Sequence, residues 1–322
     1  MRIVMMGTGT FAGPAFRKLI EAGERVVGLV TQPEREGVKP RGSSRLVGEG
    51  LAGVARAAGI PVLQPPSINV PEAIGELRSL EPDLLVVAAY GQILKPAVIE
   101  VPKLGAINIH ASLLPKYRGA SPIAHAILNG ETETGVTIIR ISPGLDAGRM
   151  LLQEAMAILP DETTGELEIR LAELGARMGF DVVQRLKVGP VDGEIQDAAL
   201  VTKAPKLAKE QGAIDWKQPA EAIVRHVRAM QPWPTAYTFA HRPGKAPVRI
   251  ALNLVRAAGE FAVNAKPGSW LVDSPAGSLY VACGQQSVLS VLALQPAGKS
   301  RLLAADYLRG HPLVSECRFD AG

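Results

Sequence analysis

The stretch "GAINIHASLLPKYRGASPI" (residues 105–123) carries the strongest signal for the fold. It opens with an apolar run that is typical of a strand covered on both faces of a parallel sheet. Asn108 and His110 interrupt this run. Because side chains alternate along a strand, the two polar residues are predicted to share one face near the strand's carboxyl end.

The first half of the chain alternates apolar runs with helical patterns on both sides of this stretch. Strands are predicted at "RIVMMG" (2–7), "VVGLVT" (26–31), "DLLVVAAY" (83–90), "TGVTIIRI" (134–141) and "GRMLLQEAMAI" (148–158). This order predicts an α/β domain with a Rossmann-like, mostly parallel sheet. Sites in such sheets lie at the carboxyl ends of the strands, so we expect Asn108 and His110 to meet the loops after Tyr90 and Ile141 there.

The pattern changes after about residue 189. Residues 189–206 are rich in polar and turn-forming residues and are expected to be a linker. From residue 207 to 322, short apolar runs alternate with Gly and Pro turns, which predicts a small, OB-like β-barrel. The expected organisation is therefore a sheet domain over 1–188 followed by a C-terminal barrel.

Composition limits the classes of protein that this chain could be. It has 322 residues, of which 47% are hydrophobic, so it can form real cores. The two cysteines form no disulfide framework, and this favours a reduced, cytoplasmic setting. No run of about 18 apolar residues occurs, so no membrane span is expected. No His and Cys cluster suggests a metal site.

The charge is distributed unevenly along the chain. Residues 1–199 hold 20 Lys and Arg against 23 Asp and Glu, whereas residues 200–322 hold 15 against 8. A basic second part favours an anionic partner such as nucleic acid. The alternative is a surface that is simply rich in arginine. The same choice applies to the polar loop 32–48, which is expected to be mobile and either solvated or a phosphate clamp.

Three polar residues suggest a chemistry. Asn108 can donate an N–H to a developing oxyanion, and His110 can move a proton near neutral pH. Asp146 follows another apolar run in the turn "PGLDAG" and can orient an imidazole. Acyl transfer between amines needs these three tasks. Taken alone, each residue is more often structural, Asn108 and His110 as hydrogen-bonded residues of a strand and Asp146 as a turn former.

Motifs along nearly the whole chain resemble the 10-formyltetrahydrofolate-dependent formyltransferases. They are "PDLLVVAAYGQIL", "INIHASLLPKYRGASPI", "TGVTIIRISPGLDAGRML", "KAPKLAKEQGAIDW", "RAMQPWPTAY" and "LQPAGKSRLLAADYLRG". The Ile-Asp-Trp and Pro-Trp-Pro segments are similar to the branch that formylates methionyl initiator tRNA. Two positions depart from the family's usual Gly-Leu-Asp-Thr-Gly-Asp turn, where Ala147 and Arg149 stand here.

The resemblance implies a one-carbon transferase that uses 10-formyltetrahydrofolate, with Asn108 on the formyl oxygen, His110 as proton shuttle, and Asp146 holding His110 and an ordered water. It implies folate contacts at Tyr90, Gly91, Gln92, Ile93, Leu94, Ser112, Leu113, Leu114, Pro115, Ser142, Pro143 and Gly144. It implies tRNA contacts at Arg35, Lys39, Arg41, Arg45, Lys203, Lys206 and Lys209. A monomer without a metal or membrane partner is expected.

Two other functions stay open at this point. A folate-dependent formyltransferase acting on a small amine, such as an amino sugar, would share the three polar residues but would not need a basic barrel. An RNA-binding protein without catalytic activity would bind tRNA in a salt-sensitive way but would not bind folate.

Overall fold

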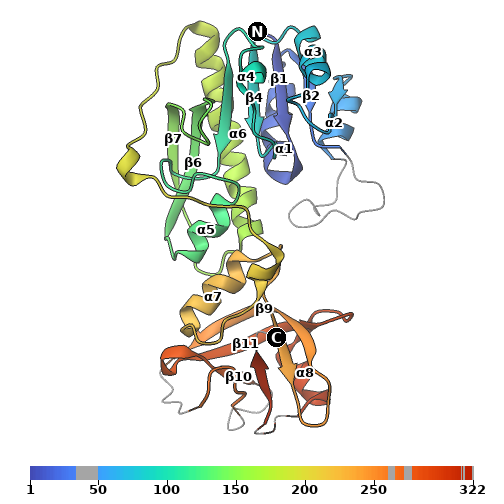
Figure 1. Cartoon of the computed structure of the whole chain (residues 1–322), viewed down its shortest axis with the longest axis vertical. Helices are drawn as coiled ribbons and strands as arrows, with labels where there is room; N and C mark the ends of the chain where they lie inside the picture. Colours follow the sequence, from blue (N-terminus) through green and yellow to red (C-terminus); the bar gives the residue numbers. More distant parts are fainter. Residues whose placement is uncertain (34–49, 260–264, 272–277, 313, 315, 321–322) are drawn as a thin grey trace. The chain divides into compact units, whose positions relative to one another are not determined.

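The computed structural model of the protein describes residues 1–33, 50–259, 265–271, 278–312, 314 and 316–320 (Figure 1). The chain forms two compact units. The first comprises Met1–Ala126, Thr132–Leu159 and Gly165–Lys206, and the second comprises Ile127–Glu131, Pro160–Thr164 and Leu207–Gly322. The predicted tRNA contacts Arg35, Lys39, Arg41 and Arg45, and with them most of the 32–48 loop, lie outside the described residues.

The first unit is built on a seven-stranded sheet of order β3-β2-β1-β4-β5-β6-β7. Its elements are β1 (Ile3–Gly7), α1 (Gly9–Glu21), β2 (Val26–Val30), α2 (Leu51–Ala57), β3 (Val62–Leu63), α3 (Pro71–Ser79), β4 (Leu84–Ala88), α4 (Pro96–Ile99), β5 (Ala106–His110), α5 (Pro122–Leu128), β6 (Glu133–Arg140), β7 (Met150–Ala157) and α6 (Thr164–Val188). In the sheet order, the neighbouring strands from β3 to β5 pair in parallel. Strand β6 pairs antiparallel with both of its neighbours, β5 and β7. The mostly parallel α/β sheet is therefore confirmed.

Strand β5 is packed so that its polar residues face away from α6. A Cβ atom added at Gly175 or Gly179 of α6 would lie 2.6 or 2.8 Å from the side chain of Ile109, so these glycines let the helix approach the strand closely. Asn108 instead pairs with Val87, which belongs to the core cluster on the α3 and α4 side of the sheet. The alternation of the strand therefore sets the side on which the polar residues lie.

Strand β6 corrects one part of the sequence prediction. Arg140, the last residue of β6, pairs with Ile107 near the start of β5. The 141–149 loop therefore leaves the sheet at the end opposite to the carboxyl ends of the parallel strands. The expectation that it starts at those carboxyl ends was wrong, because an apolar run has the same pattern in a parallel and in an antiparallel strand.

Residues 193–204, here called the strap, run along the first unit, although the sequence suggested a linker. The Glu194 backbone exchanges two hydrogen bonds of 2.9 Å with Met150. Further along, Arg118 N–H donates to Thr202 O (2.9 Å), and Ala204 N–H donates to Arg118 O (2.7 Å). Gly119 has φ +129° and lies so close to the strap that a Cβ atom there would come within 2.4 Å of Ala204 O. Only glycine fits this approach.

The second unit contains an antiparallel sheet of order β10-β11-β9-β8-β13, with β12 beside β11. Its elements are α7 (Ala220–Ala229), β8 (Tyr237–His241), β9 (Val248–Ala258), β10 (Leu279–Ala282), β11 (Val288–Pro296), β12 (Leu302–Leu303), α8 (Ala304–Gly310) and β13 (Arg318–Asp320). Bridges from Ser269 to Arg318 and from Trp270 to Val281 join the two outer strands. The sheet is thereby nearly closed, and this confirms the expected barrel.

An aromatic cluster fills the barrel. The rings of Trp216 and Phe319 stack with their centroids 5.4 Å apart, and Trp270 meets Phe319 edge to face at 4.9 Å. All three side chains are buried. The indole N–H of Trp216 donates to Thr238 Oγ1 (3.0 Å), which satisfies one buried polar group of the cluster. The Ile-Asp-Trp segment noted in the sequence thus supplies a core residue.

Candidate functional site

His110, the last residue of β5, has a defined orientation. Its side chain is only 6% exposed, and its Nε2 lies 3.0 Å from the carbonyl oxygen of Tyr117. A carbonyl oxygen only accepts, so Nε2 carries a proton in the neutral ring. The other nitrogen, Nδ1, lies 3.7 Å from Asp146 Oδ2. Nδ1 is therefore the nitrogen without a proton in the neutral ring, and it faces the Asp146 carboxylate.

Asp146 is held by groups from outside its own loop. Its residue adopts φ +47°, a region that few residues other than glycine occupy. Oδ2 accepts a hydrogen bond of 2.9 Å from Gly119 N–H, and the Asp146 carbonyl oxygen accepts one of 2.7 Å from Gln196 Nε2. The structure thus brings Asp146 back from the 141–149 loop to His110.

Asn108 lies two residues before His110, on the same face of β5, and is half-buried. Within the part of the chain that the structure describes, no hydrogen bond engages its side-chain amide. This amide N–H is therefore available to a bound carbonyl oxygen. Such a donor, fixed on a strand beside a proton carrier, suits stabilisation of an oxyanion.

The loop after β5 is fixed by a buried polar network. Thr137 of β6 is fully buried; its hydroxyl donates to Ser112 O (2.7 Å) and accepts from Leu114 N–H (3.1 Å). Gln153 Nε2 donates to Leu114 O and to Thr137 Oγ1, both at 2.8 Å. Of the expected folate contacts here, Ser112 and Leu114 are buried, whereas Leu113 and Pro115 are partly exposed.

In the loop after β4 the Tyr90 phenol is buried, and the Tyr90 carbonyl oxygen accepts a hydrogen bond of 3.1 Å from Gln32 Nε2. Tyr90 is 2% exposed and packs in the sheet core, where burial raises the pKa of its hydroxyl to about 12. Gly91 has φ +84°, which favours glycine. The Gln92 side chain accepts from Ile68 N–H (2.9 Å), and Asn69 Nδ2 donates to Ile93 O (2.9 Å).

The loop after β4 and the 141–149 loop each expose a large apolar side chain. Ile93 is 71% exposed and Leu145 is 59% exposed, although both are large and hydrophobic. Leu94, by contrast, is buried in the core. Ser142 is half-buried, and Pro143 and Gly144 are exposed. Exposed apolar side chains of this kind suit the face of a flat heterocyclic ligand.

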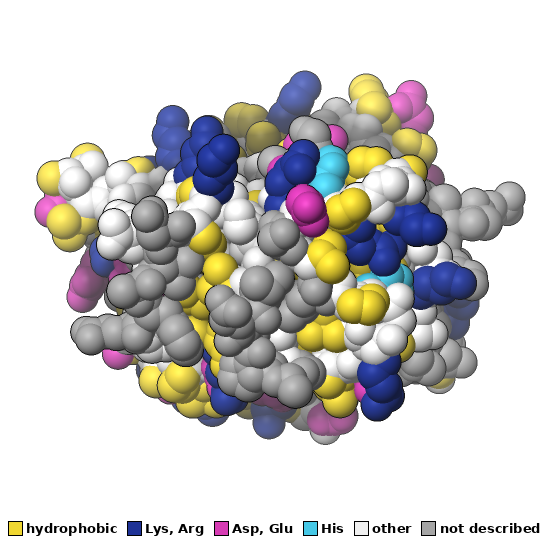
Figure 2. All heavy atoms as spheres, turned by 90° about the horizontal axis from the view of Figure 1, so that it is seen from below, with side chains coloured by type: hydrophobic (Ala, Val, Ile, Leu, Met, Phe, Trp, Pro, Cys, Tyr) yellow, Lys and Arg dark blue, Asp and Glu magenta, His cyan; other side chains and the backbone are white. Residues whose placement is uncertain are grey.

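The described basic residues of the sequence prediction are open to solvent. Lys203, Lys206 and Lys209 are all exposed, and none of the three forms an ion pair with a residue that the structure describes. Lys203 and Lys206 belong to the first unit and Lys209 to the second. Figure 2 shows Lys and Arg side chains distributed among hydrophobic atoms over the face seen there. Such cations can neutralise phosphates.

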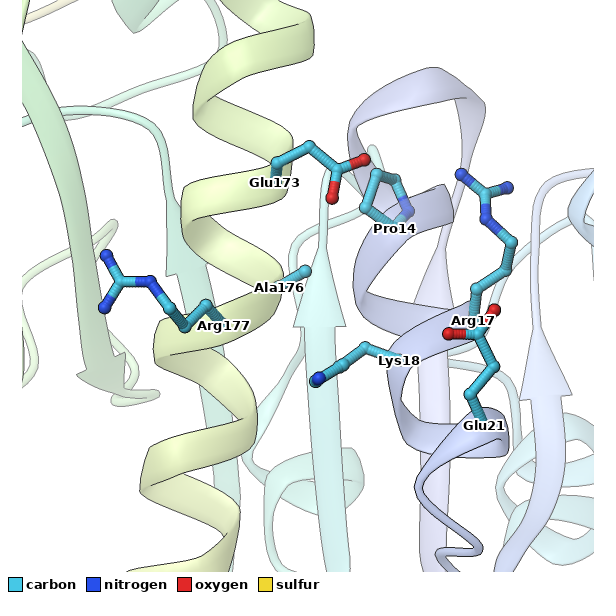
Figure 3. Close-up of a pocket in the computed structure, with 7 residues that line it drawn as sticks. All are labelled: Pro14, Arg17, Lys18, Glu21, Glu173, Ala176 and Arg177. Atoms are coloured by element: carbon cyan, nitrogen blue, oxygen red, sulfur yellow. The ribbon is translucent and has the colours of Figure 1, made fainter.

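A hollow of about 360 Å³ lies elsewhere on the first unit, between α1 and α6 (Figure 3). Its lining mixes charges of both signs, from Arg17, Lys18, Glu21, Glu173 and Arg177, with Pro14 and Ala176. None of the predicted site residues lines it. The Arg177 guanidinium already pairs with Glu154 at 2.5 Å. We therefore place the candidate site at His110 and not in this hollow.

Sequence reasoning missed two side chains near Asp146. Gln196 of the strap is 7% exposed, and Arg118 donates to its Oε1 from Nε (3.0 Å) and from a terminal nitrogen (2.7 Å). Arg118 stood within the quoted motif, but no periodic pattern surrounds Gln196. Only the folded chain brings together residues 78 positions apart.

Neither a metal cluster nor a membrane span is present among the described residues. No group of three or more His, Cys, Asp and Glu side chains there is arranged to hold a metal ion. In the same residues, no helix has both the length and the apolar character needed to cross a bilayer.

Solved structures share the fold of the chain. The sugar 3N-formyl transferase WlaRD, solved with dTDP and 5-N-formyl-THF, matches with a TM-score of 0.66 at 18% identity, over 93% of this chain and 99% of that one. HypX from Aquifex aeolicus, in complex with tetrahydrofolic acid, matches with a TM-score of 0.62 at 17% identity, over 96% of this chain and 47% of that one. At such identities the likeness is one of fold.

Sequence comparisons reach further. A methionyl-tRNA formyltransferase of Citrifermentans bemidjiense is 47% identical over 97% of this chain and 94% of its own length. That of Methylococcus capsulatus is 43% identical over 98% and 99%. The family model described as formyl transferase matches residues 1–183, and that of the formyl transferase C-terminal domain matches residues 206–312. The resemblance noted in the sequence is confirmed, and this chain belongs to the formyl transferase family.

Proposed function

We propose that this chain transfers the formyl group of 10-formyltetrahydrofolate to the α-amino group of methionyl initiator tRNA. The observation that carries the proposal is the pairing of His110 Nδ1 with the Asp146 carboxylate at 3.7 Å, on the strand face that also holds Asn108. The names of the full-length relatives favour methionyl-tRNA as the acceptor over an amino sugar.

The reaction forms one bond and breaks another. The lone pair of the amine nitrogen attacks the formyl carbon, and the carbonyl π electrons move to oxygen. The Asn108 amide N–H donates to this oxyanion and stabilises it. When the carbonyl re-forms, the bond from carbon to the folate N10 breaks. The products are the formylated amine and tetrahydrofolate, with N10 now bearing a proton.

His110 carries the proton between the two nitrogens. The attacking amine becomes acidic once it is bonded to carbon, and His110 Nδ1 accepts its proton. The imidazolium then faces the Asp146 carboxylate while Nε2–H remains bonded to Tyr117 O at 3.0 Å. Return of the proton to N10 completes the cycle and leaves His110 neutral. General acid and base catalysis of this kind contributes roughly 10²–10⁴-fold to rates.

The donor is assigned to the loops around these residues. Backbone groups of Tyr90 to Leu94 and of Ser142 to Gly144 would hold the pterin, and Ser112 to Pro115 would contact the remaining folate. This part of the proposal is supported by the exposed apolar side chains of Ile93 and Leu145, and by the folate ligands named for two proteins of the same fold.

The acceptor is assigned to the basic surfaces. Lys203, Lys206 and Lys209 would contact tRNA phosphates, as would Arg35, Lys39, Arg41 and Arg45. Residues 1–188 would form the catalytic domain and 207–322 the tRNA-binding barrel. A cytoplasmic monomer remains our prediction, and light scattering of the purified protein would check the monomeric state.

A formylation assay tests the proposal. Purified protein is mixed with 10-formyltetrahydrofolate and methionyl initiator tRNA, and the formylated product is measured. Uncharged tRNA, free methionine and an amino sugar serve as alternative acceptors. Product only with the charged tRNA is the expected result. Product with the amino sugar alone, or no product with any acceptor, would contradict it.

A further inference from the structure

The strap holds the catalytic loop in place through one buried side chain. We propose that Gln196, together with Arg118, is a positioning residue that fixes the Asp146 carboxylate against His110. The catalytic part of this inference rests on the proposed function. Nothing in the predicted chemistry requires Gln196 itself to touch a substrate, so its effect passes through Asp146.

All four hydrogen-bonding positions of the Gln196 amide are used. Its Oε1 accepts two bonds from the Arg118 guanidinium, at 2.7 and 3.0 Å. Its Nε2 donates to Asp146 O (2.7 Å) and to Gly148 O (2.8 Å). Arginine only donates and carbonyl oxygens only accept, so the amide can take only this orientation. The side chain therefore holds residues 146–148 in one defined position.

The loop and its partner are also tied from the other side. Gly119 N–H donates to Asp146 Oδ2 at 2.9 Å, and the neighbouring Arg118 backbone is bonded to the strap at both its N–H and its C=O. Arg118 thus anchors the backbone that holds the carboxylate and, through Gln196, the backbone that carries it. The backbone of Asp146, with φ +47°, needs such external support because this conformation is unfavourable by itself.

Charge makes the clamp sensitive to a change of one atom. A Gln196→Glu substitution keeps one oxygen that can accept both hydrogen bonds from Arg118. It places a second oxygen, in place of the amide nitrogen, against the carbonyl oxygens of Asp146 and Gly148. Acceptors would then face acceptors, and the loop would be pushed away. A Gln196→Met substitution keeps the side-chain length and removes all four bonds. Both variants leave Asn108, His110 and Asp146 unchanged.

The test measures turnover of the full chain. For Gln196→Glu and Gln196→Met we expect kcat to fall about 10–100-fold, since a displacement of about 1 Å in a reacting constellation can have a 10²-fold effect. The KM for methionyl-tRNA should stay unchanged. Gln184→Met is the matched control, because Gln184 lies on α6 outside the strap and its side chain forms hydrogen bonds with Glu24 (2.8 Å) and Lys187 (3.3 Å) instead of with the Asp146 loop. Its kcat should equal that of the wild type.

Coupling between the two side chains gives a second kinetic reading. If Arg118 and Gln196 act as one clamp, Arg118→Met should lower kcat by a similar factor. The double variant should then be hardly slower than either single variant, because the clamp is already open. Independent, multiplicative losses would overturn the joint role of the pair.

Amide exchange gives a reading that does not depend on activity. In Gln196→Met, the Gly119 amide and residues 145–148 should exchange faster, while amides of β6 and β7 keep their protection. Unchanged exchange of the loop overturns the clamp, and unchanged kcat overturns its role in positioning. If the wild type itself fails to formylate methionyl-tRNA, the proposed function fails, and the exchange result alone decides whether Gln196 holds the loop.

Discussion

The loops around His110 and the core of the barrel both bury large parts of the chain, but with different interactions. Around His110 the buried groups are polar: Ser112, Thr137 and Gln196 satisfy backbone groups of irregular loops. In the barrel, Phe319 is buried between the rings of Trp216 and Trp270. Hydrogen bonds have direction and modest net energy, whereas burial of large aromatic side chains contributes a larger hydrophobic energy that is itself non-directional.

The two units should therefore respond differently to substitution. Changes in the polar loops should alter turnover more than the free energy of unfolding, because these bonds set positions. Changes in the aromatic cluster should do the reverse.

Removing the reacting side chains should have the largest effect. Asn108→Ala and His110→Ala are expected to lower kcat roughly 10²–10⁴-fold, because oxyanion stabilisation or proton transfer is lost. For Asn108→Ala the midpoint of thermal unfolding should hardly change, since its amide has no partner within the described part of the chain. Single-turnover kinetics and calorimetry check this. Full turnover in both variants would refute the assigned mechanism.

The barrel core should show the opposite behaviour. Phe319→Ala should reduce the free energy of unfolding of the second unit by about 3–5 kcal/mol, because it leaves a cavity between two indoles. Denaturant unfolding followed by tryptophan fluorescence measures it. Leu303→Ala is the control, since Leu303 is 61% exposed and should change stability by less than about 0.5 kcal/mol. Equal effects of the two variants would contradict the role of the cluster.

Thr137→Val tests where the contrast breaks down. The substitution preserves shape but leaves the Leu114 N–H without its acceptor, and it removes one acceptor of Gln153. A buried unsatisfied group has a penalty of about 1–3 kcal/mol. We expect a loss of that size in stability of the first unit together with weaker folate binding, measured by urea unfolding and by titration. A variant as stable as the wild type would show that this loop tolerates water.

The smallest predicted effect concerns pH. Hydrogen bonds from the Gln218 side chain and then from Lys217 N–H lower the pKa of Asp215 below its usual 3.8. A carboxyl with a depressed folded pKa adds stability above its unfolded pKa, and this stability is lost as the pH falls through the folded value. Asp215→Asn should therefore flatten the acid side of the stability profile by less than about 1 kcal/mol, since the group is exposed. Urea midpoints between pH 3 and pH 6 would check it, and identical slopes would contradict it.

The sequence was informative wherever a short-range pattern determines structure. Apolar runs located the parallel strands, and alternation along β5 placed Asn108 and His110 on one face. Turn-rich short strands located the barrel. The family signal then pointed to Asp146, whose loop starts at the other end of the sheet.

The remainder depends on long-range contacts that no local pattern encodes. The antiparallel sense of β6 follows from tertiary pairing, and α4, α8 and β13 are too short to give a clear period. The strap has no periodicity, since its role depends on single bonds to Arg118 and Met150. The choice of Nδ1 as the reacting nitrogen of His110 requires the position of Tyr117 O.

The strap also has a consequence for the order of events during synthesis. The chain leaves the ribosome from its N-terminus, so strand β5 and the loop that contains Asp146 emerge well before Gln196 and Ala204. The sheet can form early, but His110 and Asp146 reach their final relation only when residues 193–204 have followed and joined Arg118. A nascent chain that stops at α6 would therefore carry every reacting side chain and yet lack the assembled site.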